Sequence, residues 1–198
     1  MRADDFRTNG MIAAIERRNW PLAITTVDPG PDSYLDGSVE ARLLEDIENA
    51  RIAAGASSVW LAGISLGCQG ILRCVRRRPA LAAGLLLLTP YLASTGLVAE
   101  VVRTGGLRRW AASHPTPATP EQSLLSWLGT APASSLPPMI VGHAEHDRFA
   151  TTALLLADRV PPEHMISVPG PHDWSSWVPL WREMLDRNPF SQPMAAAL

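Results

Sequence analysis

A continuous apolar run over residues 82–88 is the feature that most narrows the choice of fold. It reads Ala-Ala-Gly-Leu-Leu-Leu-Leu, so neither alternating face of a strand would carry a polar side chain. A strand buried on both faces is typical of the centre of a parallel sheet that is covered by helices. Helical patterns at 4–18 and 38–54 alternate with further apolar runs, which predicts the α/β class with a mostly parallel sheet.

Three more segments are predicted to form buried strands of the same sheet. Leu22–Val27 is one of them, and the turn residues Asp-Pro-Gly-Pro end it. The other two lie at 138–142 and 165–169 and lead into polar turns. In the helix predicted at 38–54 one face is apolar, and it carries Val39, Leu43, Ile47, Ala50 and Ala54.

The segment Gly-Ile-Ser-Leu-Gly at 63–67 lies between a strand candidate at 58–62 and a helix candidate at 68–75. In this context G-x-S-x-G is the pattern of a nucleophile elbow, where strained backbone presents a serine hydroxyl at the sheet edge. The turn is tight enough for flanking side chains to collide, and we expect Gly63 and Gly67 to remove that collision. The alternative is an ordinary strand-to-helix turn that contains glycines.

A serine becomes a good nucleophile only beside a base that is oriented by a carboxylate. Asp147 follows the strand predicted at 138–142, and His172 follows the strand predicted at 165–169. Because the carboxyl ends of parallel strands share one edge of a sheet, we expect these two side chains to meet Ser65 there. The order serine, acid, histidine is also the order expected for this kind of sheet.

Other titratable groups near these turns leave alternatives open. Glu145 could replace Asp147 as the acid, and Asp173 is expected to cap the next helix. His143 and His146 suggest a metal site together with Asp147. No His-Glu-x-x-His or cysteine–histidine signature supports it, so no metal is predicted.

These motifs resemble those of bacterial α/β-hydrolase-fold serine esterases. The similarity rests on the elbow, on the turn Gly-His-Ala-Glu-His-Asp and on Gly-Pro-His-Asp-Trp-Ser-Ser-Trp, and it spans most of the chain. It implies Ser65 as nucleophile, Asp147 as acid, His172 as base and the backbone N–H of Leu66 as an oxyanion donor. It also implies a three-layer α/β sandwich with a small helical cap, and no cofactor.

The N-terminal part departs from this family, in which a central strand and an oxyanion loop precede the first helix. Here a helix is predicted almost at once, and the missing strand would lie between 22–28 and 58–64. We expect an unpaired strand edge that a second copy could cover, giving a homodimer. The backbone of Met1 or Arg2 is a candidate second oxyanion donor. A misassigned start codon, a minimal version of the fold and a degenerate fragment are three open explanations.

The predicted organisation is one hydrolase core interrupted by a cap. The core comprises 1–91 and 137–190, the cap insertion 92–136, and the flexible tail 191–198. Within the cap, Trp110, Leu124 and Trp127 are predicted to line an acyl pocket. The alternative is that they pack the cap onto the core.

The composition fits a compact enzyme. Hydrophobic residues make up 46% of the chain and the formal net charge is −2, so no nucleic-acid partner is expected. Cys68 and Cys74 would lie about 9 Å apart along one helix, which predicts free thiols and a reducing compartment. With no signal peptide or membrane span recognised, a cytoplasmic protein without a membrane partner is expected.

The sequence therefore predicts a serine hydrolase that cleaves a small-molecule carboxylic ester or thioester through an acyl-enzyme. One alternative is a thioesterase or acyltransferase that acts on a carrier-bound acyl group. Another is a non-catalytic, hydrolase-like binding protein without a complete oxyanion hole.

Overall fold

The α/β class and the parallel sheet are confirmed by a computed structural model, which describes residues 2–190. Four strands form one sheet in the order β1 (Trp60–Ile64), β2 (Gly84–Leu88), β3 (Met139–Ala144) and β4 (Met165–Val168). All three pairings are parallel. The run at 82–88 becomes β2, which has a neighbour on each side and is buried along its whole length.

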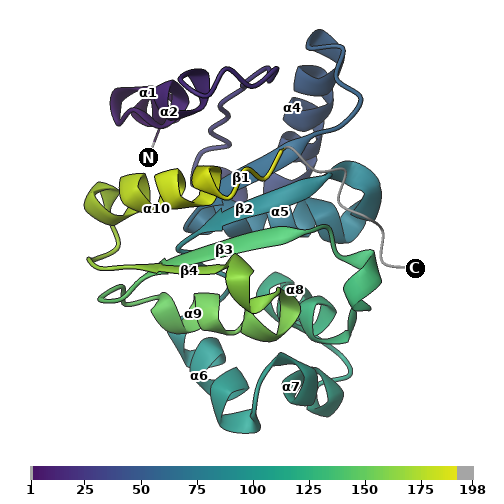
Figure 1. The fold of residues 1–198 in the computed structure, drawn as a ribbon. Helices are drawn as coiled ribbons and strands as arrows, with labels where there is room; N and C mark the ends of the chain where they lie inside the picture. Colours follow the sequence, from purple (N-terminus) through teal and green to yellow (C-terminus); the bar gives the residue numbers. More distant parts are fainter. Residues whose placement is uncertain (1, 191–198) are drawn as a thin grey trace.

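Helices cover both faces of this sheet, as Figure 1 shows. On one face, α5 (Leu66–Arg77) contacts β1, α4 (Val39–Ala53) and α8 (Pro120–Thr130). On the other face, α10 (Trp174–Asp186) crosses β2, β3 and β4 and contacts α2 (Met11–Glu16). The alternation along β2 divides the core, because Leu85 and Leu87 join one hydrophobic cluster while Leu86 and Leu88 join the other.

The remaining helices are short and connect these layers. They are α1 (Ala3–Thr8), α3 (Asp32–Leu35), α6 (Thr95–Thr104), α7 (Leu107–Ser113) and α9 (Ala150–Leu154), with 3-10 turns at Pro79–Leu81, Ala133–Ser135, Ala157–Arg159 and Pro162–His164. The single helix predicted at 4–18 is therefore wrong. Gly10 adopts φ +74° and separates α1 from α2. Among the helices of residues 2–190, none has the length and apolarity needed to cross a bilayer.

The strand predicted at Leu22–Val27 is also wrong. This segment is extended but joins no sheet, and Leu22, Ile24 and Val27 are 38%, 37% and 37% exposed. The apolar, β-branched composition favours a strand, but a strand also needs a neighbour with free backbone groups. In the described part of the chain, no strand lies between this segment and β1, so its ladder does not form.

The insertion predicted at 92–136 contains α6, α7 and α8 between β2 and β3. Its apolar side chains share a hydrophobic cluster with α4 and α5. In Figure 1 these helices lie on the α5 side of the sheet. The division into core and cap stays a prediction, and the tail predicted at 191–198 lies outside the described residues.

Candidate active site

Ser65 occupies a strained turn between β1 and α5. Its backbone has φ 53° and ψ −118°, a conformation that few non-glycine residues adopt. Three backbone hydrogen bonds hold it there. Its N–H donates to the Leu88 carbonyl at 3.0 Å, and its own carbonyl accepts from the N–H groups of Tyr91 at 3.1 Å and Cys68 at 3.0 Å. A segment held from both sides in this way can keep a strained residue in place.

The two elbow glycines have different roles. A Cβ added at Gly63 would lie 2.8 Å from both the Cys68 nitrogen and the Gly67 carbonyl carbon, so only glycine fits there. A Cβ added at Gly67 would meet nothing within 4 Å. The expected collision is therefore confirmed for Gly63 and is wrong for Gly67, because the turn brings the start of α5 onto residue 63 while residue 67 faces open space.

Three of the predicted residues come together in a hydrogen-bonded chain. His172 Nε2 lies 2.9 Å from Ser65 Oγ, and His172 Nδ1 lies 2.6 Å from Asp147 Oδ2. The Asp147 side chain is fully buried, and its other oxygen accepts the Phe149 N–H at 2.7 Å. A buried carboxylate favours a proton on Nδ1, which leaves Nε2 free to accept the serine proton.

The turn after β4 sets the position of His172. Gly170 has φ +116°, and a Cβ there would lie 2.4 Å from Ser176 Oγ, so a larger residue would displace the start of α10. Asp173 caps that helix as expected, because its carboxylate accepts the Ser175 N–H at 2.8 Å. Hydrogen bonds from Ser175 lower the pKa of Asp173, whereas the carboxylate that is hydrogen-bonded to the imidazole is that of Asp147.

The alternative roles weighed from the sequence find no support in the structure. Glu145 is exposed and contacts Ser167 at 3.5 Å, whereas the imidazole contacts Asp147. Within residues 2–190, no group of three histidine, cysteine or carboxylate side chains is arranged to hold a metal ion. The two cysteines are free and buried, and burial raises the pKa of the Cys74 thiol to about 12.

Leu66, the predicted oxyanion donor, lies at the start of α5. Leu66 is the first residue of this helix, so its N–H has no acceptor within the helix. The Tyr34 hydroxyl donates to the Leu66 carbonyl at 3.1 Å and so ties the next peptide, between Leu66 and Gly67, to α3. Burial raises the pKa of Tyr34 to about 12. The Arg2 N–H, a candidate second donor, instead donates to Asp5 Oδ2 at 2.6 Å, and Met1 lies outside the described residues.

The predicted acyl-pocket residues take part in the hydrophobic packing of the insertion. Trp110 and Leu124 have no exposed surface, and Trp110 Nε1 donates to Glu100 at 2.9 Å. Trp127 is partly buried against the same hydrophobic cluster. These positions favour the packing alternative for Trp110 and Leu124.

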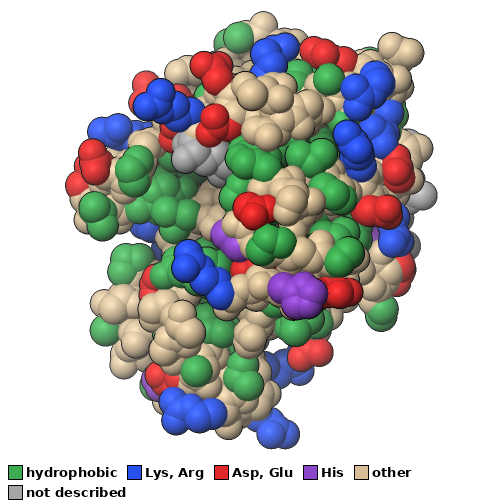
Figure 2. Space-filling view, turned by 90° about the vertical axis from the view of Figure 1, so that its left-hand side faces the viewer, with side chains coloured by type: hydrophobic (Ala, Val, Ile, Leu, Met, Phe, Trp, Pro, Cys, Tyr) green, Lys and Arg blue, Asp and Glu red, His purple; other side chains and the backbone are tan. Residues whose placement is uncertain are grey.

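Aromatic side chains that the sequence analysis did not single out surround the imidazole. Phe149 and Trp177 meet the His172 ring edge-to-face, with centroid distances of 5.0 and 5.3 Å. Tyr91 contacts Phe149 at 5.4 Å. We call Tyr91, Phe149 and Trp177 the aromatic collar. The sequence gives only a weak indication of this collar, because its residues are distinguished only by lying near predicted strand ends and near the predicted triad. Figure 2 shows the face at this edge of the sheet, where histidine side chains lie among hydrophobic ones.

Comparison with known proteins yields distant structural similarity only. No family model matches the chain, and no curated protein matches its sequence. A ferulic acid esterase structure aligns with a TM-score of 0.49 and 14% identity, covering 77% of this chain and 60% of that one. Brefeldin A esterase, a bacterial homologue of human hormone-sensitive lipase, aligns with a TM-score of 0.47 and 18% identity over 77% of this chain and 50% of its own. An esterase from Thermogutta terrifontis aligns with a TM-score of 0.44 and 19% identity, covering 76% of this chain and 69% of that one.

Proposed function

We propose that the chain is a serine hydrolase that cleaves a carboxylic ester through an acyl-enzyme. The observation that carries the proposal is the hydrogen-bonded chain from Ser65 through His172 to the buried carboxylate of Asp147. The strained backbone of Ser65 supports it, because such strain is costly and is concentrated at functional positions.

The proposed reaction begins when Ser65 Oγ attacks the ester carbonyl while His172 Nε2 takes its proton. Asp147 holds the imidazole in the required tautomer and stabilises the imidazolium that forms. The Leu66 N–H, at the positive end of α5, donates to the developing oxyanion. The imidazolium then protonates the leaving alcohol, and water activated by the same imidazole releases the acid.

The aromatic collar is the part of the site best placed to contact the substrate. Phe149 and Trp177 flank the imidazole that must reach the leaving group, and both rings are only partly buried. Aromatic rings give a large apolar contact area, so we propose an ester with an apolar acyl or alcohol group.

A second candidate is a hydrolase-like binding protein that acylates and does not turn over. It is favoured by the Arg2 N–H, which is engaged by Asp5 and leaves Leu66 as the one donor assigned among the described residues. Loss of one oxyanion donor costs roughly 2.7–4 kcal/mol of transition-state stabilisation. Such a chain would react once with an activated ester and then stop.

The test is hydrolysis of p-nitrophenyl esters of increasing acyl length by wild type, Ser65→Ala and Ser167→Ala. Ser167 is the matched control, because it is an exposed serine beside the same edge whose hydroxyl contacts Glu145 and no imidazole. We expect Ser65→Ala to lose at least about 10³-fold in kcat/KM and Ser167→Ala to match wild type. One equivalent of p-nitrophenol without turnover would favour the second candidate, and no Ser65-dependent release would contradict both.

A further inference from the structure

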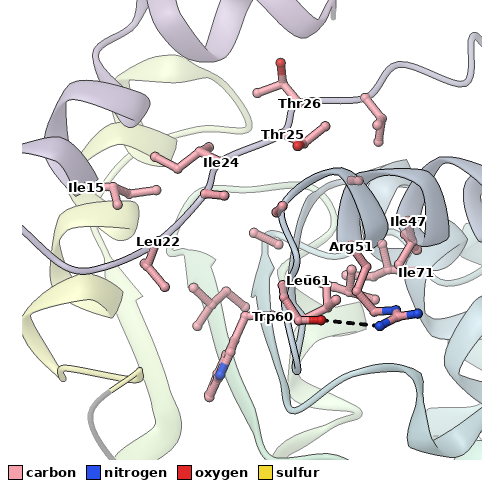
Figure 3. Close-up of a pocket in the computed structure, with 18 of the residues that line it drawn as sticks. Ile15, Leu22, Ile24, Thr25, Thr26, Ile47, Arg51, Trp60, Leu61 and Ile71 are labelled. Carbon is pink, nitrogen blue, oxygen red and sulfur yellow. Dashed lines mark hydrogen bonds between the residues drawn. The ribbon is translucent and has the colours of Figure 1, made fainter.

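A large cavity lies along the side of β1 that faces away from β2. Its volume is about 580 Å³, and it separates β1 from the extended segment around Leu22–Val27. Figure 3 shows Leu22 and Ile24 on one wall and Trp60 and Leu61 on the other. Asp46 and Arg51 supply the charged side chains of a lining that is otherwise apolar or uncharged.

Along this cavity the backbone of β1 has no hydrogen-bonded partner among residues 2–190. Val59 and Ser65 bond to the β2 side, through the Val59 carbonyl and the Ser65 N–H. Successive residues of a strand alternate in direction, so Trp60, Ala62 and Ile64 turn their N–H and C=O groups toward the cavity. Within residues 2–190, no strand accepts or donates to them, and Ala62 is exposed in the middle of its strand.

Residues 22–27, which form the opposite wall, also lack backbone hydrogen bonds to a neighbouring strand in the described part of the chain. The one backbone hydrogen bond formed by the described residues 22–27 is local, from the Leu22 N–H to the Trp20 carbonyl. This wall has the β-branched composition of a strand, yet its large apolar side chains are more than a third exposed. Two extended segments, neither of which pairs with another strand in the described part of the chain, therefore face each other across one apolar space.

The size of the space matches a single strand. One residue of a strand inside a layered sheet occupies about 4.8 Å by 3.3 Å by 10 Å, or roughly 160 Å³. The cavity of about 580 Å³ thus corresponds to about four residues of strand. A folded sheet edge from a second copy would bring its own layers of helices, and residues 21–27, which form the far wall of this space, leave no room for them.

We infer that this cavity is a docking site for one extended apolar peptide strand of about four residues, supplied in trans and parallel to β1. Such a strand would bond to Trp60, Ala62 and Ile64 on one side and to residues 22–27 on the other. This is strand addition, in which main-chain hydrogen bonds give affinity and alternate side-chain pockets give specificity. Parallel alignment follows the three existing pairings, since purely parallel sheets are favoured over mixed ones. The inference is independent of the proposed esterase activity.

The test measures residue-resolved amide hydrogen exchange with and without the capped peptide Lys-Val-Ile-Val-Val-Lys. We expect exchange at Trp60, Ala62 and Ile64 to slow at least about tenfold, with a smaller change at Leu61 and Gly63, which already bond to β2. The same peptide with proline in place of its isoleucine lacks a needed N–H and should give no protection. Fusing the active peptide ahead of Met1 through a Gly-Ser linker raises its effective concentration to the millimolar range.

A matched pair of variants locates the binding site. Ile24→Asp places a charge on the far wall of the cavity, whereas Val102→Asp places a charge on α6, and the two wild-type residues are 37% and 49% exposed. Only Ile24→Asp should weaken the protection by the peptide. Absence of protection from both the free and the fused peptide would overturn the inference. So would prior protection of Ala62 in the protein alone, whether through dimerisation or through direct pairing of residues 22–27 with β1.

Discussion

Replacing each elbow glycine by alanine tests how the fold presents Ser65. In Gly63→Ala the new Cβ would lie 2.8 Å from two backbone atoms, while ordinary contacts begin at 3.4 Å, so the backbone must separate by about 0.6 Å. Ser65 Oγ lies 2.9 Å from His172 Nε2, and a shift of that size takes the pair beyond a good hydrogen bond. We expect a loss of about 1–3 kcal/mol in the free energy of unfolding, as for other overpacked sites.

Gly67→Ala is the matched control, because it adds the same methyl group two residues after Ser65, whereas Gly63 lies two residues before it. Its Cβ meets open space, and alanine is a better helix former than glycine, so its stability should be unchanged or higher by up to about 1 kcal/mol. Urea unfolding measures the stability, and the rate of fluorophosphonate labelling measures the reactivity of Ser65. We expect labelling to fall by about 10²-fold in Gly63→Ala and to persist in Gly67→Ala. Equal effects of the two variants would refute this account of the elbow.

Other predictions follow from the triad, the support of the elbow and the cysteines. Asp147→Asn should lower esterase kcat by about 10⁴-fold with little change in KM, because the asparagine favours the wrong tautomer of His172. Tyr34→Phe should cost about 1 kcal/mol of stability in urea below pH 10. Because the folded-state pKa of Tyr34 is raised to about 12, wild-type stability should fall as pH rises from 10 through 12, and this fall should be smaller in the variant. Cys68 and Cys74 should react with a thiol reagent only after unfolding, since burial raises both thiol pKa values, and rapid labelling of the folded chain would contradict their burial.

Sequence reasoning was most successful where a local pattern has a single structural solution. The apolar run at 82–88 can be satisfied only by burial on both faces, and it became β2. The convergence of Ser65, Asp147 and His172 followed from their places after strands, because a parallel sheet brings such positions to one edge. Both inferences depend on topology and not on the details of side-chain packing.

The errors arose where the outcome depends on distant neighbours or on backbone direction. Residues 22–27 have strand composition but lack a paired neighbour, and composition alone does not reveal that absence. Gly67 matches the elbow pattern as well as Gly63 does, yet only the path of α5 shows which of them is crowded. Tyr34 lies far from Ser65 in sequence and supports the elbow through a single backbone contact.

The most direct test of the central claim is intact-mass measurement after treatment with a fluorophosphonate probe, followed by peptide mapping. The account predicts one adduct on wild type, mapped to Ser65, and none on a folded Ser65→Ala variant. It also predicts the same single adduct on Ser167→Ala. No adduct on the folded wild type, or an adduct that persists in Ser65→Ala, would contradict the assignment of Ser65 as an activated nucleophile.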